Sequence, residues 1–325
     1  KTDCDNVQVF EIVALFFLFQ DHSPKRLSQR VILQNDNYRG IVRIIARNGV
    51  FMSLILGLDV GGSTTKVVGF EDGKMLESVI VKASDPLASA YAGLGKFVEA
   101  TGRKLSQIDT VMATGVGASC LSGDLLERKT ILVNEFESVG IGGIFLAGIQ
   151  EAIVVSMGTG TSLVEAKGSN VRHIIGSGVG GGTLLGLADR LINVSDFDTI
   201  NELSKSGKLE NVDLTVGDLT QKEIPGLTPS TTASNFGKLA GLSEPEDLAA
   251  GIVNLVFQSV GTAAVLAASL CQLNTIVVTG NLTRMRLGRQ ILENFSQLYG
   301  VNFLIPDQAE YATAIGAALQ GCKIT

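Results

Sequence analysis

The predicted secondary-structure elements of this sequence follow the same order twice, and this repeat restricts the folds that the chain can adopt. In each half, three strand patterns come in succession, and helical patterns then alternate with strand patterns. The three strands of the first half are predicted at residues 53–60, 64–72 and 74–83. Those of the second half are predicted at residues 152–158, 161–168 and 170–176. Two similar α/β lobes facing each other across a cleft are a common arrangement for binding a nucleotide.

The remaining elements complete the repeat. Helices are predicted at residues 86–101, 135–148, directly after 180–182, 244–270, 285–300 and 312–321, and strands at 109–113, 130–133, 275–280 and 301–306. Asp72 and Gly73 are predicted to form a hairpin turn, and Ser243 with Glu246 a capping box before the longest helix. The polar stretch 204–229 is expected to be mobile. We therefore expect an N-terminal lobe at residues 52–150 and a C-terminal lobe at residues 151–325.

Residues 1–51 differ in composition from the rest and end just before Met52, where the first clear strand pattern begins. We interpret them as a disordered upstream or cloning-derived extension. Their apolar stretch, Ile12 to Phe19, is too short to span a bilayer, and no basic stretch precedes it as in a signal peptide. A short helix on a membrane surface is the less favoured alternative.

Charge and cysteine content exclude several classes of function. The net charge is −6 and the sequence contains no long basic run, which argues against nucleic-acid binding. The cysteines at positions 4, 120, 271 and 322 are scattered, and the chain has only two His residues. This distribution argues against a zinc site and a disulfide scaffold. We expect a cytoplasmic protein that binds neither nucleic acid nor membrane.

The first loop that could bind phosphate is LDVGGSTTK, Leu58 to Lys66. Gly61 and Gly62 allow a phosphate to approach the backbone closely, and Lys66 supplies a positive charge. A strand follows the loop, so it is neither a Walker A loop nor a Rossmann loop. A buried Asp59 at the end of the preceding strand would need a partner, which a water on Mg²⁺ could provide. A glycine hairpin without a ligand is the alternative.

Two further glycine-rich loops lie in the second half. SMGTGTS, Ser156 to Ser162, again connects two strands, so the pair of hairpins could hold phosphate from both sides of a cleft. Gly176-x-Gly178-x-x-Gly181 before a helix matches a dinucleotide fingerprint, which leaves NAD binding as an alternative. The acids expected to bind ribose, Asp196 and Asp198, should end a strand. They instead follow Ser195, which we predict to cap a helix, so we disfavour this alternative.

Taken together, these loops give the chain from Met52 to Gly321 a resemblance to the type II pantothenate kinases, members of the acetate and sugar kinase/Hsp70/actin superfamily. LDVGGSTTK and SMGTGTS resemble the two phosphate motifs of the family, and VNEFES resembles its catalytic segment. GSGVGGGTLLGL is similar to its glycine signature, and STTASNFGKL, VVTGNL and AEYATAIGAAL are similar to further family segments. The resemblance implies an actin-like ATPase fold with two ribonuclease H-like lobes.

The resemblance also implies site residues. ATP would contact Asp59, Val60, Gly61, Gly62, Ser63, Thr64, Thr65, Lys66, Thr159, Gly181, Gly182, Thr183, Leu184, Leu185, Phe197 and Asn281. The catalytic base would be Glu135. Independently, Asn134 resembles a helix N-cap with Glu137 completing its box, which places Glu135 in the first turn, where the helix dipole favours the ionised carboxylate. The alternative is that both acids only complement the dipole. We expect Glu135 to be functional and Glu137 structural.

The sequence departs from the family where the substrate is expected to bind. The resemblance implies substrate contacts at His173, Gly176 and Ser177, but the family has Arg at the position of His173. Arg172 is one residue away, and neighbours on a strand point to opposite faces. His173 could bond a carbonyl or hydroxyl of the substrate, but it lacks the bidentate geometry of Arg. Plain packing of His173 is the alternative.

The leading hypothesis is ATP- and Mg²⁺-dependent phosphorylation of the primary hydroxyl of pantothenate, the first step of coenzyme A biosynthesis. One alternative is a kinase for a related alcohol or sugar. A second is the activator ATPase of 2-hydroxyacyl-CoA dehydratases, although Cys120 and Cys271 lack the spacing for its cluster. A third is a nucleotide-binding pseudokinase. The resemblance also implies a homodimer, for which the long helix from Glu244 is a candidate interface.

Overall fold

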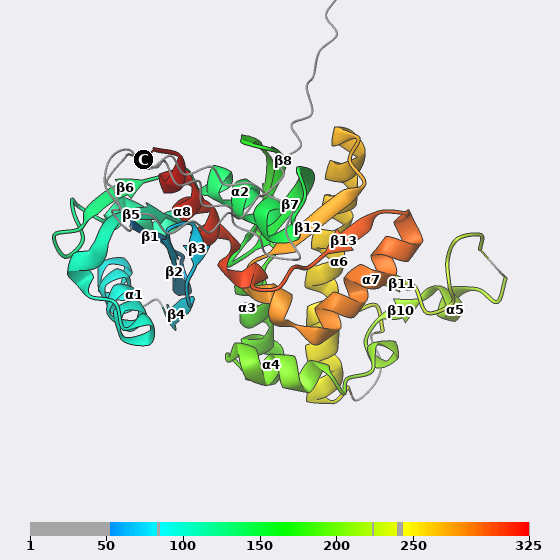
Figure 1. Cartoon of the computed structure of the whole chain (residues 1–325). Coiled ribbons are helices and arrows are strands. Elements are labelled where there is room, and N and C mark those ends of the chain that lie inside the picture. The colour runs from blue at the N-terminus through cyan, green and yellow to red at the C-terminus, as the bar shows by residue number, and fades with distance from the viewer. Residues whose placement is uncertain (1–52, 83–84, 223, 239–242, 325) are drawn as a thin grey trace, which may run out of the picture.

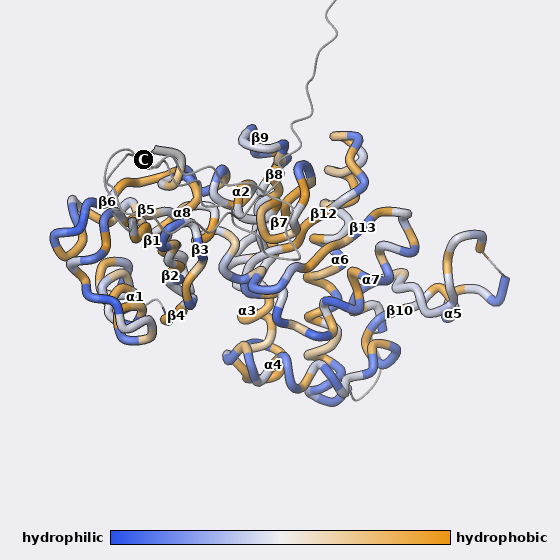
Figure 2. Tube along the Cα trace, in the orientation of Figure 1, coloured by the Kyte–Doolittle hydropathy of each residue, from blue (hydrophilic) through white to orange (hydrophobic). Residues whose placement is uncertain are grey.

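The computed structural model describes residues 53–82, 85–222, 224–238 and 243–324, and the interpretation of residues 1–51 lies outside them. Two mixed sheets with helices on their faces form two lobes (Figure 1). The N-terminal sheet has the order β3-β2-β1-β5-β6, with β4 also paired to β2, and the C-terminal sheet has the order β13-β12-β7-β8-β9. In Figure 2 the strands of both sheets carry many hydrophobic residues.

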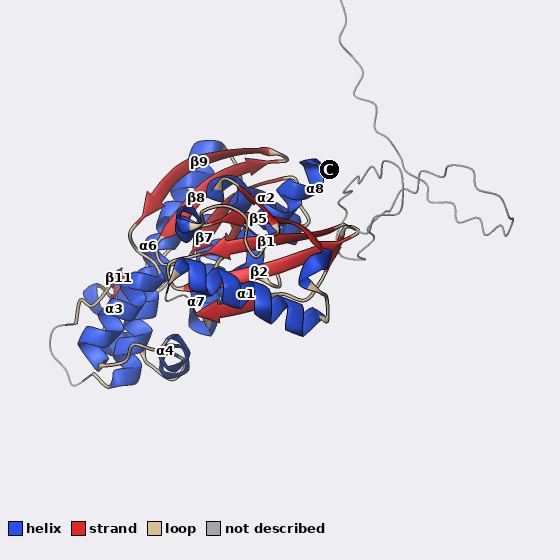
Figure 3. Cartoon of the chain, turned by 90° about the vertical axis from the view of Figure 1, so that its left-hand side faces the viewer, coloured by secondary structure: helices blue, strands red, loops and turns tan. Residues whose placement is uncertain are grey.

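The N-terminal sheet contains β1 (Leu54–Val60), β2 (Thr64–Glu71), β3 (Lys74–Met75), β4 (Val79–Lys82), β5 (Ile108–Thr114) and β6 (Lys129–Leu132). β2 runs antiparallel to β1, whereas β5 and β6 run parallel to it. The prediction of one strand at 74–83 is wrong, because β3 and β4 pair with opposite ends of β2 and leave residues 76–78 between them. Helix α1 (Pro86–Thr101) has its predicted bounds and covers one face of the sheet (Figure 3).

The C-terminal sheet repeats this pattern. It contains β7 (Glu151–Met157), β8 (Thr161–Lys167), β9 (Asn170–Ser177), β12 (Thr275–Thr279) and β13 (Asn302–Leu304). β8 runs antiparallel to β7 and β9, and β12 runs parallel to β7 and β13. The predicted repeat of an antiparallel hairpin joined to parallel strands is therefore present in both sheets.

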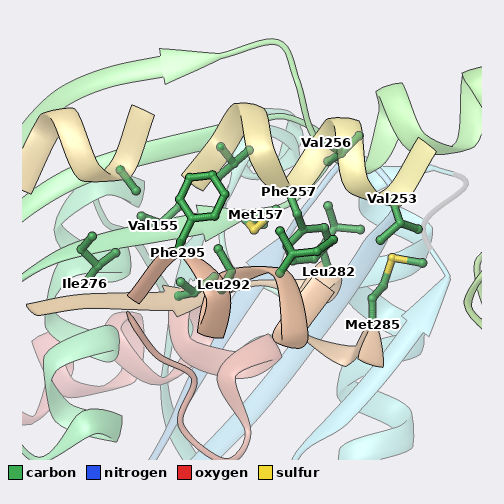
Figure 4. Close-up of a cluster of buried hydrophobic side chains, with 14 of the residues drawn as sticks. Val155, Met157, Val253, Val256, Phe257, Ile276, Leu282, Met285, Leu292 and Phe295 are labelled. Carbon is green, nitrogen blue, oxygen red and sulfur yellow. The ribbon is translucent and has the colours of Figure 1, made fainter. Parts of the chain in front are cut away.

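The largest core lies between the C-terminal sheet and its helices α3 (Gly181–Ile192), α4 (Phe197–Ser204), α6 (Pro245–Cys271) and α7 (Arg286–Tyr299). Phe257 of α6 and Phe295 of α7 are among its buried side chains (Figure 4). Of the described helices, only α6 is long and apolar enough to span a membrane, and 61% of its apolar window is buried inside the protein. This burial is what a core helix requires.

Two helices each pack on the sheet of the other lobe. Helix α8 (Ala312–Ile324) follows the C-terminal strands but packs on β1 and β5 through Ala314 and Ala318. Helix α2 (Glu135–Ala147) packs on the C-terminal sheet, and the two helices lie against each other (Figure 1). A Cβ on Gly142 would lie 1.8 Å from the carbonyl oxygen of Ala312, and one on Gly316 would lie 1.8 Å from that of Ser138. The packing of these helices thus crosses the division that we predicted at residue 150.

The polar stretch that we expected to be mobile contains ordered structure. It includes strand β10 (Leu214–Thr215) and helix α5 (Val216–Leu219), and β10 pairs with β11 (Thr232–Ser234). These elements project from the C-terminal lobe as an arm (Figure 1). Buried Asp213 holds the base of the arm by accepting bonds from Phe236 N at 2.8 Å and Asn254 Nδ2 at 2.6 Å.

Short 3₁₀ helices connect several of these elements: Leu105–Gln107, Val116–Cys120, Leu209–Asn211, Asn281–Arg284 and Ala309–Tyr311. Two cap predictions are wrong. Asp196 rather than Ser195 caps α4, because its carboxylate accepts the Thr199 N–H. Glu244 precedes α6 without a side-chain cap, and Ser243 Oγ donates to Asn211 O instead.

Candidate functional site

Asp59 and Lys66 form a buried ion pair at the first loop. They are directly opposite each other on β1 and β2, with Lys66 Nζ 3.7 Å from Asp59 Oδ2, and each residue is only 7% exposed. Burial raises the pKa of Asp59 above its ordinary value, and the charge of Lys66 opposes that shift. The partner that the buried carboxylate was predicted to need is therefore provided, at least in part, by Lys66.

The two hairpin loops meet across the lobes. Ser63 Oγ of the β1–β2 loop lies 3.1 Å from Thr159 Oγ1 of the β7–β8 loop, within hydrogen-bond distance. Gly62 is also close, because a Cβ there would lie 3.4 Å from the same oxygen of Thr159. The two hairpins therefore face each other, with hydroxyl groups from both lobes at the contact.

Equivalent glycines flank both hairpins. Gly115 follows β5 with φ 92°, and Gly280 follows β12 with φ 91°. A Cβ on Gly115 would lie 2.7 Å from Asp59 Oδ1, and one on Gly280 would lie 2.5 Å from Met157 O. Only glycine suits this backbone and this spacing. The Thr-Gly pairs at 114–115 and 279–280 repeat at equivalent positions of the two lobes, and this repeat is the sequence signal for these glycines.

Several predicted ATP contacts have side chains that face away from this site. Val60 and Leu184 are buried in the cores of their lobes, and Leu185 packs against the C-terminal core. Thr65 Oγ1 donates to Ser89 Oγ of α1 at 3.0 Å. Gly61 N–H bonds to Thr64 O at 3.0 Å within the hairpin. Alternation along the strands explains this, because Val60 and Thr65 lie on the opposite face from Asp59 and Lys66.

The start of α3 packs directly on the second hairpin. The N–H groups of Gly181 and Gly182 donate to the carbonyl oxygens of Gly158 and Thr159, each at 2.8 Å. These two donors are therefore engaged within the chain rather than open to a phosphate. Thr183 Oγ1 donates to Gly178 O at 2.9 Å and closes the turn before α3. The glycine signature thus fixes the loop that carries Thr159.

Glu135 is the first residue of α2 and interacts electrostatically with Asp59 and Lys66. Desolvation by burial raises the pKa of Glu135, the negative charge of Asp59 raises it further, and Lys66 lowers it. The net shift is opposite to the effect that we expected from the helix dipole, because burial dominates. Asn134 caps the helix as predicted by accepting the Glu137 N–H at 3.1 Å. The predicted capping box is not formed, because the exposed Glu137 side chain does not accept the Asn134 N–H. A carboxyl with a raised pKa is well suited to accept a proton.

Two further predicted ATP contacts, Phe197 and Asn281, lie near Arg284: Asn281 shares its 3₁₀ helix, and Phe197 lies against its guanidinium. The Arg284 guanidinium lies 5.2 Å from the centre of the Phe197 ring, and its Nη2 donates to Asp198 at 3.0 Å. Asn281 Oδ1 is buried without a hydrogen-bond partner among the described residues. An unpaired buried acceptor is a position where a ligand donor would fit. Arg284 lies two residues after the VVTGNL segment and was not among the predicted site residues.

The residues predicted to bind substrate lie on β9. His173 is opposite Val164, on the face that packs on α2, whereas Arg172 is on the other face and bonds Glu165 Oε2 through Nε and Nη2 at 2.9 and 2.7 Å. Arg172 and His173 therefore point to opposite faces of β9, as strand alternation predicts. Gly176 and Ser177 end the strand, and Ser177 Oγ accepts the Val179 N–H at 3.1 Å.

The carboxylates of the site do not form a cage for a metal ion. Among the described residues, no group of three or more His, Cys, Asp or Glu side chains could hold one. Asp59 alone could contact a hydrated cation, as the sequence predicts, because Mg²⁺ commonly keeps several waters and uses one or two protein carboxylates.

Comparison with known proteins identifies related sequences. The Fumble family model matches residues 149–320. The chain is 26% identical over 272 residues to the type II pantothenate kinase of Staphylococcus haemolyticus, which covers 81% of this chain and 98% of that protein. It is 43% identical over 136 residues to pantothenate kinase 1 of Oryza sativa subsp. japonica, across 39% of this chain and 20% of that protein.

A solved structure supports the predicted fold. The activator of the 2-hydroxyisocaproyl-CoA dehydratase from Clostridium difficile, solved with bound ADPNP, superimposes with a TM-score of 0.60 over 83% of this chain and 95% of the activator. The sequence identity is 19%, so this likeness concerns the fold and not the activity. The predicted actin-like ATPase fold with two lobes is confirmed.

Proposed function

This chain belongs to the Fumble family, and on that premise we propose that it transfers the γ-phosphoryl group of ATP to the primary hydroxyl of pantothenate. The product is 4'-phosphopantothenate, and the reaction is the first step of coenzyme A biosynthesis. The observation that carries the proposal is the position of Glu135, a partly buried carboxyl influenced by both members of the Asp59–Lys66 pair, beside two facing hairpins. Phosphoryl transfer to an acceptor hydroxyl needs a base, a positive charge and hydrogen-bond donors close together.

Glu135 acts as the base. The hydroxyl oxygen of the acceptor forms a bond to the γ-phosphorus while the bond from that phosphorus to the β-bridging oxygen breaks, which releases ADP. The acceptor proton passes to the Glu135 carboxylate. Its raised pKa makes the carboxylate a stronger proton acceptor than an exposed Glu. Lys66 stabilises negative charge that develops on the transferred group, since most of the rate in phosphoryl transfer comes from positioning and charge stabilisation.

The two hairpins would hold the phosphates of ATP. Ser63 and Thr159 present their hydroxyls at the contact between the lobes, and Gly62 leaves space for the approach of a phosphate oxygen. Asn281 and Phe197 would contact the nucleoside end, with the free Asn281 Oδ1 as an acceptor. Asp59 would contact a water on Mg²⁺, and the ion when bound would neutralise charge on the phosphates.

We propose a homodimer in the cytoplasm as the working form. The C-terminal part of α6 carries Leu266, 66% exposed, and Leu270, 72% exposed, one turn apart on one side of the helix. Two exposed leucines on one side of a helix are more easily explained by a partner surface than by contact with solvent. Size-exclusion chromatography with light scattering tests this arrangement, and a protein that remains monomeric at micromolar concentration would contradict it.

The reaction is tested by measuring ADP release from the purified chain with pantothenate, pantetheine and common sugars as acceptors. Glu135→Gln should lower kcat by about 100- to 10,000-fold while ATP binding stays nearly intact. Glu137→Gln is the matched control, because only the backbone N–H of this exposed acid takes part in the Asn134 cap. This variant should keep wild-type turnover. Turnover retained in Glu135→Gln would sink the assignment of the base. ATP binding without ADP release for any acceptor would favour the pseudokinase.

A further inference from the structure

The ring of Phe136 stacks on the imidazole of His173. Their ring centres are 4.0 Å apart and their planes are inclined by 23°. Phe136 belongs to the first turn of α2 and directly follows Glu135, whereas His173 belongs to β9. The stack therefore joins the residue next to the proposed base to the position where the family has its substrate-binding Arg.

The packing of α2 on β9 sets the geometry of this stack. Phe136 and Gly140 are four residues apart and so lie on one side of α2, and Val171 and His173 are two residues apart and so lie on one face of β9. A Cβ on Gly140 would lie 2.7 Å from both methyl groups of Val171, which shows that the helix backbone rests on this side chain. One turn earlier, the same two surfaces bring Phe136 onto His173.

The stacked imidazole is free to bind a ligand. Within the described part of the chain, no group hydrogen-bonds to either ring nitrogen of His173, and the residue is exposed. Its Nε2 lies 4.0 Å from the place of a Cβ on Gly176, so this edge of the ring is directed along β9 toward the other predicted substrate contacts. Arg172 lies on the opposite face and is held there by Glu165.

We propose that Phe136 is a positioning residue for the acceptor. Its ring holds the His173 imidazole with one edge open, and that edge makes a single hydrogen bond to a carbonyl or hydroxyl oxygen of the acceptor while the primary hydroxyl lies at Glu135. The proposal rests on the proposed function. An imidazole that is already held loses less conformational freedom on binding, so the stack lowers the KM for the acceptor without changing the chemical step.

Kinetics of matched variants test the role of the ring. Phe136→Leu removes the stack and keeps an apolar side chain, and it should raise the KM for pantothenate by about 3- to 10-fold, the effect of one aromatic pair. The KM for ATP and kcat should change less than about twofold, and Phe136→Tyr should recover the wild-type KM. Combining Phe136→Leu with His173→Ala should add little to His173→Ala alone, because both changes remove the same contact.

Tyr299→Leu is the control for loss of a part-exposed aromatic ring. Tyr299 lies at the end of α7 against Phe295, with ring centres 5.2 Å apart, and contacts no residue of the proposed site. It should leave both KM values unchanged. An unchanged KM for pantothenate in Phe136→Leu, or a fully additive double variant, would overturn the proposal.

NMR of the histidine ring protons provides a readout that does not depend on turnover. The chain has two His residues, and His173→Gln identifies which resonances belong to His173. The stacked ring should shift these resonances upfield, Phe136→Leu should remove the shift, and Phe136→Tyr should keep it. Resonances that do not respond to Phe136→Leu would overturn the positioning role. A wild-type chain that shows the shift but does not phosphorylate pantothenate would instead overturn the proposed function.

Discussion

Asp59 Oδ2 and Lys66 Nζ lie 3.7 Å apart on directly paired positions of β1 and β2, and both residues are almost fully buried. Neither charge is surrounded by water, so each depends on the other. This interdependence leads to a prediction about stability.

Lys66→Met should lower the free energy of unfolding by about 3 kcal/mol, because it leaves the Asp59 carboxylate buried without its cation. The double variant Asp59→Asn with Lys66→Met should recover much of that loss, since neither of the two side chains is then charged. Urea denaturation at neutral pH measures both. Equal stability of the single and double variants would contradict the interdependence of the pair.

The stability of the chain should depend on pH through Glu135. Burial and Asp59 raise its pKa in the folded state above the unfolded value of about 4.3, so the folded state favours the protonated carboxyl. This contribution to stability is fully present below the unfolded pKa and is lost as the pH rises through the folded pKa. The unfolding free energy of wild type relative to Glu135→Gln should therefore decrease from about pH 4 toward neutrality. Urea denaturation at several pH values measures this, and a difference constant with pH would contradict it.

Thr159→Val should raise the KM for ATP by about 2- to 10-fold, the value of one hydrogen bond, because it removes the hydroxyl that meets Ser63 between the lobes. Thr159→Ser should preserve the wild-type KM. Thr65→Val is the matched control, since the Thr65 hydroxyl bonds Ser89 behind the sheet. Thr65→Val should lower stability and leave the KM for ATP unchanged, and the reverse pattern would show that the faces of β2 are assigned incorrectly.

His173→Arg should lower the KM for pantothenate by about fivefold, because a guanidinium makes stronger, charge-assisted bonds than an imidazole. The Phe136 ring is a suitable surface for either group, since Arg also stacks on aromatic rings. Steady-state kinetics with pantothenate as the varied substrate measures the change. A higher KM would indicate that the acceptor of this chain is matched to the imidazole.

Gly316→Ala should lower the free energy of unfolding by about 3 kcal/mol, because its Cβ would lie 1.8 Å from the Ser138 carbonyl oxygen of α2. Gly186→Ala is the matched control in α3, where a Cβ would meet nothing within 4 Å. This control should raise stability by about 0.5 to 1 kcal/mol through helix propensity. Thermal and urea denaturation distinguish the two, and a tolerated Gly316→Ala would mean that α2 and α8 can separate.

Local patterns predicted the elements and the loops well. Pro86 after a capping Asp85 and the left-handed Gly102 define α1, and apolar runs ended by glycine define β1 and β7. The pairing of Asp59 with Lys66 also follows from the hairpin register, although Lys66 was predicted only to contact phosphate. The faces of Val60 and Thr65 were likewise available from strand alternation.

Contacts between distant segments could not be predicted in this way. The carbonyls that occupy the Gly181 and Gly182 N–H groups belong to residues more than twenty positions earlier, and no local pattern reports them. The packing of α2 and α8 on the sheets of the opposite lobes could not be predicted for another reason. Both helices are apolar on most sides, so their sequences do not indicate which sheet each one covers.

The position of α8 has a consequence for synthesis of the chain. Ile55, Val68 and Met112 leave the ribosome well before the residues that cover them, which are Ala314, Ile315 and Ala318. Until those residues emerge, one face of the N-terminal sheet lacks its native cover, and the nascent lobe presents apolar strands of the kind that chaperones bind. The N-terminal sheet is thus translated before the C-terminal sheet, but it is covered only after the C-terminal strands have been made.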